Sequence, residues 1–135
     1  MLLNLLNKEE KYNFLDLLLK VNSLDGELTE FEKRVIDKFK AEMGDDINKY
    51  RRSSKSTDEL IGFFKDRSKT VKNIVYYNIA WSSYFDEFYS VEEHELLDKI
   101  VSGFEISNKK KVEIQKAVYA DRDLREKIKR IISND

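Results

Sequence analysis

Apolar residues recur along most of this chain at spacings of three and four positions, the period of an amphipathic α-helix. A broad apolar face between Lys8 and Leu24 predicts the first helix, residues 29–44 predict the second, and a short helical turn is expected over residues 45–52. Further helices are expected to begin near Ser56, Ser68, Ser90, Ser107 and Asp121 or Asp123. No segment alternates as a half-buried strand does, so the pattern predicts an all-α, single-domain bundle of about seven to eight helices.

Three of the predicted helices begin with a hydroxyl residue that is followed three positions later by glutamate. These pairs are Thr29 with Glu32, Ser56 with Glu59, and Ser90 with Glu93. In such a capping box the hydroxyl accepts a hydrogen bond from the glutamate N–H, and the carboxylate reaches back to the N–H of the first residue. The pairs therefore predict where these helices start.

The segment from Lys69 to Phe85 is apolar on several sides rather than along one stripe. A helix of this kind is usually enclosed by others, so we place it at the centre of the bundle. Its aromatic residues Tyr76, Tyr77 and Trp81 are then expected in the core, because aromatic side chains contribute large buried areas.

The amino-acid composition excludes several classes of functional site. The 135 residues contain no cysteine, which excludes disulfides, thiolate metal sites and cysteine nucleophiles. The single histidine, His94, cannot form a multi-histidine zinc site or a Ser-His-Asp triad within one chain, and it is expected as a surface or half-buried residue of a helix. A formal net charge of −1 gives no general attraction for nucleic acid. Because no apolar run approaches the ~20 residues of a membrane span and no signal peptide is evident, we expect a soluble, cytoplasmic protein.

An internal repeat appears when the chain is shifted by 61 positions. Asp25 then aligns with Asp86, and the caps at Thr29 and Ser90 coincide together with their glutamates. Capped amphipathic helices resemble one another in general, but this coincidence of acids and caps at one offset exceeds that similarity. We predict two related helix–turn–helix units, approximately residues 9–44 and 69–105.

Asp25-Gly26-Glu27-Leu28-Thr29, with Glu32 three positions on, resembles the signature of the TerB-like tellurite-resistance family. The second copy runs from Asp86 to Ser90 and Glu93. A related domain occurs at the front of a membrane-anchored DnaJ-type co-chaperone. The resemblance covers most of the chain and implies an all-helical fold with pseudo-twofold repeats, an acidic surface that binds metal, and a link to tellurite or chemical stress. The second copy departs from the family pattern, since Glu87 replaces the usual glycine and Phe88 the usual glutamate.

The candidate metal site consists of the acidic residues around the two predicted turns. Its proposed ligands are Asp25, Glu27, Glu32, Asp86 and Glu93. Carboxylate oxygens suit a divalent cation such as Ca²⁺ or Mg²⁺. An EF-hand is excluded, because its first ligand would fall on Val21. Helix capping alone also explains acids at these positions.

A protein-interaction module without metal is the alternative. Basic residues cluster over residues 49–55 and 109–111, away in sequence from the acidic turns, and such polarity can steer a charged partner or drive self-association. An acid/base hydrolase would need only paired carboxylates, but no nucleophile motif or phosphate loop accompanies them. We therefore predict a non-enzymatic binding protein that uses its acidic face to bind a divalent cation or a protein partner.

Overall fold

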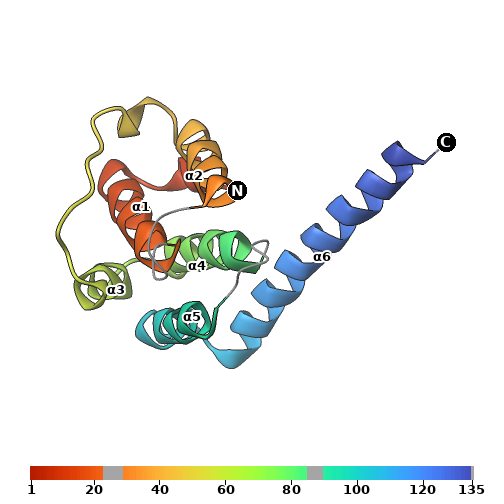
Figure 1. Cartoon of the computed structure of the whole chain (residues 1–135). Coiled ribbons are helices and arrows are strands. Elements are labelled where there is room, and N and C mark those ends of the chain that lie inside the picture. Colours follow the sequence, from red (N-terminus) through yellow and green to blue (C-terminus); the bar gives the residue numbers. More distant parts are fainter. Residues whose placement is uncertain (23–28, 85–89, 135) are drawn as a thin grey trace.

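The computed structural model describes residues 1–22, 29–84 and 90–134, and this part of the chain contains helices and no strand. Its α-helices are α1 (Lys8–Asn22), α2 (Glu30–Met43), α3 (Thr57–Lys65), α4 (Lys69–Tyr84), α5 (Val91–Gly103) and α6 (Asn108–Ser133). Two short 3₁₀ helices, η1 (Leu3–Leu5) and η2 (Asp45–Ile47), complete the order. Helices α1 to α5 form a body, and α6 extends away from it (Figure 1). The all-α prediction is confirmed.

The number of helices was overestimated, because α6 is continuous where we expected a new helix at Asp121 or Asp123. The Asp121 carboxylate does not cap a backbone N–H. It accepts hydrogen bonds from Trp81 Nε1 at 2.7 Å and from Arg125 Nε at 2.9 Å. The helical turn expected over residues 45–52 is also shorter than predicted, since only η2 forms there.

The predicted helix starts are confirmed by hydrogen bonds. Thr29 Oγ1 accepts from the Glu32 N–H at 3.1 Å, and Glu32 Oε1 accepts from the Thr29 N–H at 2.8 Å. Ser56 and Glu59 form the same two bonds. The hydroxyls of Ser68, Ser90 and Ser107 each accept from the N–H three positions on, so the capping box predicted at Ser90 and Glu93 is confirmed only in its hydroxyl half.

Helix α4 lies at the centre of the body, as its all-round apolar character predicts, and it packs against α1, α3, α5 and α6. Tyr76 is 1% exposed and Trp81 9%, so both belong to the core, while Tyr77 is half-buried. An aromatic series connects three helices: the ring of Phe39 lies 5.8 Å from Phe14 and 5.9 Å from Trp81. All buried apolar side chains in the described part of the chain belong to a single core cluster.

Buried polar side chains on α1 fix the long connection between α2 and α3. The Asp16 carboxylate accepts from the Tyr50 hydroxyl and from the Ser53 hydroxyl, both at 2.6 Å. Lys11 Nζ donates to the Met43 carbonyl at 2.8 Å. Burial, followed by the bond to Asp16, raises the pKa of the Tyr50 phenol. Side-chain bonds therefore hold residues 48–56 in place, where the chain forms no helix.

None of the described helices is long and apolar enough to cross a membrane.

Two glycines offer a matched test of this packing. Gly62 lies in the middle of α3 with open space around it, whereas a Cβ at Gly103, the last residue of α5, would overlap with Cγ2 of the buried Ile61. We expect Gly62→Ala to stabilise the protein by about 0.5–1 kcal/mol, because alanine loses less backbone entropy in a helix. Gly103→Ala should destabilise it by about 1–3 kcal/mol through overpacking. Urea unfolding of both variants measures the difference, and equal effects in the two would contradict the α3–α5 contact.

Candidate functional site

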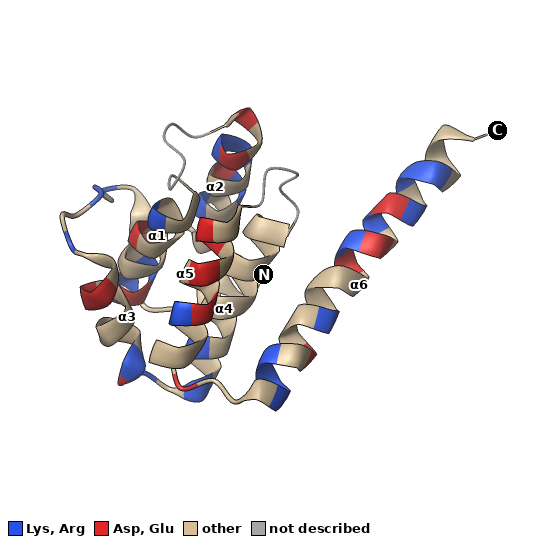
Figure 2. Ribbon diagram, turned by 60° about the horizontal axis from the view of Figure 1, so that its bottom comes forward, with Lys and Arg blue, Asp and Glu red and all other residues tan. Residues whose placement is uncertain are grey.

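The predicted metal ligands divide into two groups. Asp25, Glu27 and Asp86 lie outside the described residues. Glu32 and Glu93 are described, and they stand in the first turns of α2 and α5. These two helix starts lie toward the same end of the helical body (Figure 2).

Glu32 and Glu93 are buried, with 4% and 2% of their surface exposed. The Glu32 carboxylate is engaged in its capping box, and the Glu93 N–H donates to the Ser90 hydroxyl. Both residues therefore have a structural role at a helix N-terminus. Within residues 1–22, 29–84 and 90–134, no group of three or more His, Asp or Glu residues could hold a metal ion.

Two buried polar side chains at the helix ends were not predicted. The Asn22 side chain ends α1, is 5% exposed, and has no hydrogen-bond partner for either amide atom. The Ser83 hydroxyl, in the last turn of α4, is fully buried and has no partner either. The two residues are 61 positions apart, the offset of the predicted repeat. The 61-residue offset was the only feature of the sequence that related Asn22 to Ser83. Only the structure shows that both side chains are buried without hydrogen-bond partners.

His94 lies on the surface of α5, as predicted. Its side chain is 54% exposed, and Nε2 lies 3.4 Å from the Asp98 carboxylate one turn further along the helix.

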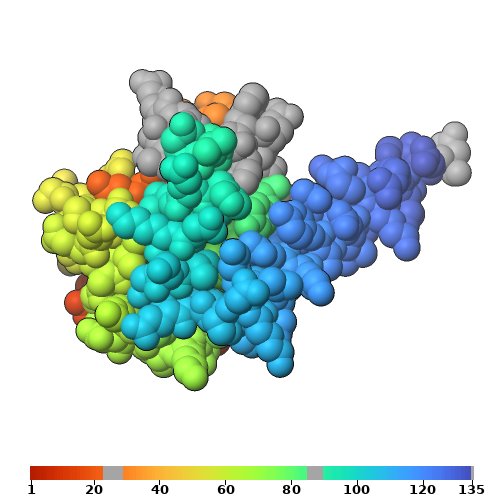
Figure 3. Space-filling model, turned by 90° about the horizontal axis from the view of Figure 1, so that it is seen from below, coloured from red at the N-terminus to blue at the C-terminus, as the bar shows by residue number. Residues whose placement is uncertain are grey.

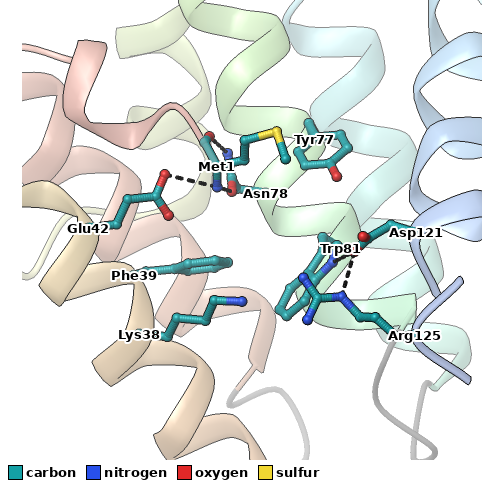
Figure 4. Close-up of a pocket in the computed structure, with 9 residues that line it drawn as sticks. All are labelled: Met1, Lys38, Phe39, Glu42, Tyr77, Asn78, Trp81, Asp121 and Arg125. Carbon is teal, nitrogen blue, oxygen red and sulfur yellow. Dashed lines mark hydrogen bonds and ion pairs between the residues drawn. The ribbon is translucent and has the colours of Figure 1, made fainter. Parts of the chain in front are cut away.

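A pocket of about 240 Å³ lies between α2, α4 and α6, beside Trp81 (Figure 4). Lys38 Nζ lies 4.8 Å from the centre of the Trp81 ring, and the Arg125 guanidinium lies 5.5 Å from it. Cations at these distances are attracted to the electron-rich ring face. The indole thus connects α2 and α6 across α4.

The charged groups of this pocket are largely engaged with one another. The Met1 amino group lies 3.1 Å from the Glu42 carboxylate and 2.6 Å from Asn78 Oδ1. Asp121 accepts from Trp81 and Arg125 (Figure 4). The arrangement is suited to attaching α6 and the N-terminal segment to the body.

The Asp121 carboxyl titrates below the ordinary aspartate range. Partial burial alone would raise its pKa, but the hydrogen bonds from Trp81 and Arg125 and the nearby positive charges outweigh burial and lower it below 3.8. A depressed carboxyl pKa means that the ionised form is favoured in the folded state. The stabilisation is present above the pKa of the unfolded chain and disappears as pH falls through the folded-state value.

Trp81 is the only tryptophan, so its fluorescence reports directly on this contact. We expect its emission to stay constant down to about pH 4 and to change below that as Asp121 becomes protonated and α6 loosens. Asp121→Asn should already show the changed emission at neutral pH and lose this acid transition. The control is Asp123→Asn, at an exposed position two residues on, and it should behave like the natural chain. Identical acid titrations in all three proteins would contradict the assignment.

Comparison with known proteins adds no family to these observations. No protein-family model matches the chain, and no curated protein or solved structure matches it. The TerB-like resemblance therefore stays a prediction from the sequence around Asp25 and Asp86.

Proposed function

We propose that this chain is a non-enzymatic, TerB-like binding protein that holds a divalent cation at the end of the bundle where α1 and α4 finish. The observation that carries the proposal is the pair of buried polar side chains without partners, Asn22 and Ser83. A buried polar group that lacks a hydrogen bond costs free energy, and such groups are rare in native proteins unless an ion, a water or a ligand satisfies them.

The chemistry of the surrounding chain supports a hard cation over other ligands. The acidic residues that follow Asn22 are Asp25 and Glu27, and those that follow Ser83 are Asp86 and Glu87. An amide oxygen, a hydroxyl and several carboxylates are the oxygen ligands that Ca²⁺ and Mg²⁺ take. The absence of cysteine and the exposed, paired position of His94 do not favour zinc.

Glu32 and Glu93 take a modified role in this proposal. Because their side chains are buried at the starts of α2 and α5, they supply negative charge at the edge of the site, and Glu32 also completes its capping box. Asp25, Glu27 and Asp86 are then the residues that contact the ion.

Adjacent serines on α4 allow a sharp test. Ser83→Ala removes a buried hydroxyl without a partner, so it should not lower stability in cation-free buffer, yet it should abolish most of the stabilisation by Ca²⁺. For the natural chain that stabilisation is about 2.7 kcal/mol at a hundredfold excess over Kd. The control Ser82→Ala removes an equally buried hydroxyl that donates to the Ile79 carbonyl. It should cost about 0.5–1.5 kcal/mol without cation and keep the Ca²⁺ response.

Thermal unfolding with and without Ca²⁺ or Mg²⁺ measures these effects, and titration calorimetry measures binding itself. Replacing Asp25 and Asp86 together by asparagine should abolish the heat, whereas Asp45→Asn on η2 should not. No heat and no change in unfolding temperature at about 10 mM of either cation would exclude the site, because even weak extracellular Ca²⁺ modules bind in the millimolar range.

The second candidate function is binding of an acidic protein partner, and the ordered basic connection before α3 favours it. Arg51 and Arg52 are exposed on a segment outside any helix. The neighbouring residues Tyr50 and Ser53 are bonded to the buried Asp16, and Lys55 Nζ donates to Asn13 Oδ1 at 3.0 Å. Two arginines are thus presented on a fixed backbone, which reduces the ordering cost of binding.

Reversing both charges in an Arg51→Glu/Arg52→Glu double variant should abolish capture of an acidic partner from a cell lysate. The control variant Arg34→Glu/Lys69→Glu changes the same number of charges at exposed positions on α2 and α4. Retention of the same partner by the double arginine variant would eliminate this candidate without affecting the cation site.

A further inference from the structure

The outer half of α6 projects from the body, and Arg125 near its start still contacts the Trp81 ring. Ile114 and Val118 in its inner half are buried, but every residue from Asp123 to Asn134 is exposed. Figure 3 shows this half projecting beyond the body. Helical segments of this length are marginal in water by themselves, and packing of an apolar face usually stabilises them.

The projecting half carries an apolar stripe, which we define as Leu124, Ile128 and Ile131. Their side chains are large, and they are 55%, 43% and 64% exposed. Spacings of four and three place them on one side of the helix. Continuing the same alternation toward the body leads to Asp121, Ala117 and Ile114.

The same side of α6 borders a groove in its inner half. The groove consists of the pocket beside Trp81 and a second pocket of about 340 Å³, which share Met1 and Tyr77 as lining residues. Asp121 lines the first pocket, while Ile114 lines the second, together with Leu2 and Ile74. One side of α6 therefore borders a concave, largely apolar groove in its inner half. The same side carries the exposed apolar stripe in its outer half.

We propose that a second copy of this chain covers the stripe, with the two α6 helices antiparallel and the outer half of each placed over the groove of the other. A twofold axis pairs the same surfaces of both copies, so a surface that contains both a projection and a matching hollow is self-complementary. This arrangement buries both features at once.

Charge supports a second copy placed in this way. Helix α6 contains nine of the 25 Lys and Arg residues but four of the 26 Asp and Glu residues, which gives it a formal charge of +5 and leaves −6 on the rest of the chain. Figure 2 shows the excess of basic residues along α6. At long range each helix is thus attracted to the net acidic remainder of the other copy, whereas two such helices alone in a parallel coiled coil would repel each other. The charged groups that line the groove itself are more basic than acidic, so contact there depends on its apolar residues.

An anionic membrane surface fits these observations less well. The basic, amphipathic outer half could lie on such a surface. A flat surface would not fill the groove, however, and anionic lipids would repel the acidic remainder of the chain.

Sedimentation equilibrium of the full chain tests the proposal. We expect a mass of twice 16.1 kDa at roughly 100 μM, and Ile128→Lys should weaken dimerisation at least about tenfold. The control Glu126→Gln changes the formal charge by the same amount on the other side of the helix and should dimerise like the natural chain. Circular dichroism should show an unchanged helix content in both variants.

A third variant tests the groove separately from the stripe. Leu2→Lys places a positive charge at an exposed groove position that would face the basic helix of the other copy, so it should weaken the dimer as Ile128→Lys does. Dimers that survive this change but not Ile128→Lys would overturn the docking onto the groove.

Two further results would overturn the proposal altogether. One is a natural chain that stays monomeric up to about 1 mM, a concentration that detects even very weak association. The other is a monomer that sediments with vesicles of roughly three parts phosphatidylcholine to one part phosphatidylserine, which would assign the stripe to a lipid surface.

Discussion

Enclosure of α4 is the constraint on which the rest of the structure depends. Val75, Ile79 and Ala80 are completely buried on a helix whose apolar residues face several directions. One neighbouring helix cannot cover such a surface, so α1, α3, α5 and the inner half of α6 must all pack around it. Packing around α4 therefore positions the end of α1, which with the end of α4 forms the candidate cation site. It also positions the inner half of α6, from which the outer half projects.

A second constraint is polar. The connection between α2 and α3 has little regular secondary structure, and the buried Asp16 organises it by accepting from Tyr50 and Ser53. Buried charged groups need such partners, because an unpaired carboxylate in the core would be strongly destabilising. The same bonds that satisfy Asp16 hold Arg51 and Arg52 in a defined position on the surface.

Local signals in the sequence predicted the fold well, and signals that depend on distant residues did not. The caps at Thr29, Ser56 and Ser90 were correct because every participating atom lies within one helical turn. Asp121 was misread as a helix start because its partner, Trp81, is 40 residues away. The acidic segments could be recognised from composition, but the proposed ligands Asp25 and Asp86 lie outside the described residues. Asn22 was overlooked, since only burial distinguishes it from an ordinary polar residue at a helix end.

The last turn of α4 strengthens the case that the unpartnered Ser83 hydroxyl is meaningful. Its neighbours in this turn are fully satisfied: Trp81 Nε1 donates to Asp121, and the Ser82 hydroxyl donates to the Ile79 carbonyl. Loose packing at a helix end would be expected to leave several polar groups exposed to water, yet Ser83 is completely buried. An unsatisfied hydroxyl in a turn that is otherwise well bonded supports the proposed cation site, because an ion bound there would give the hydroxyl the partner it lacks in the described part of the structure.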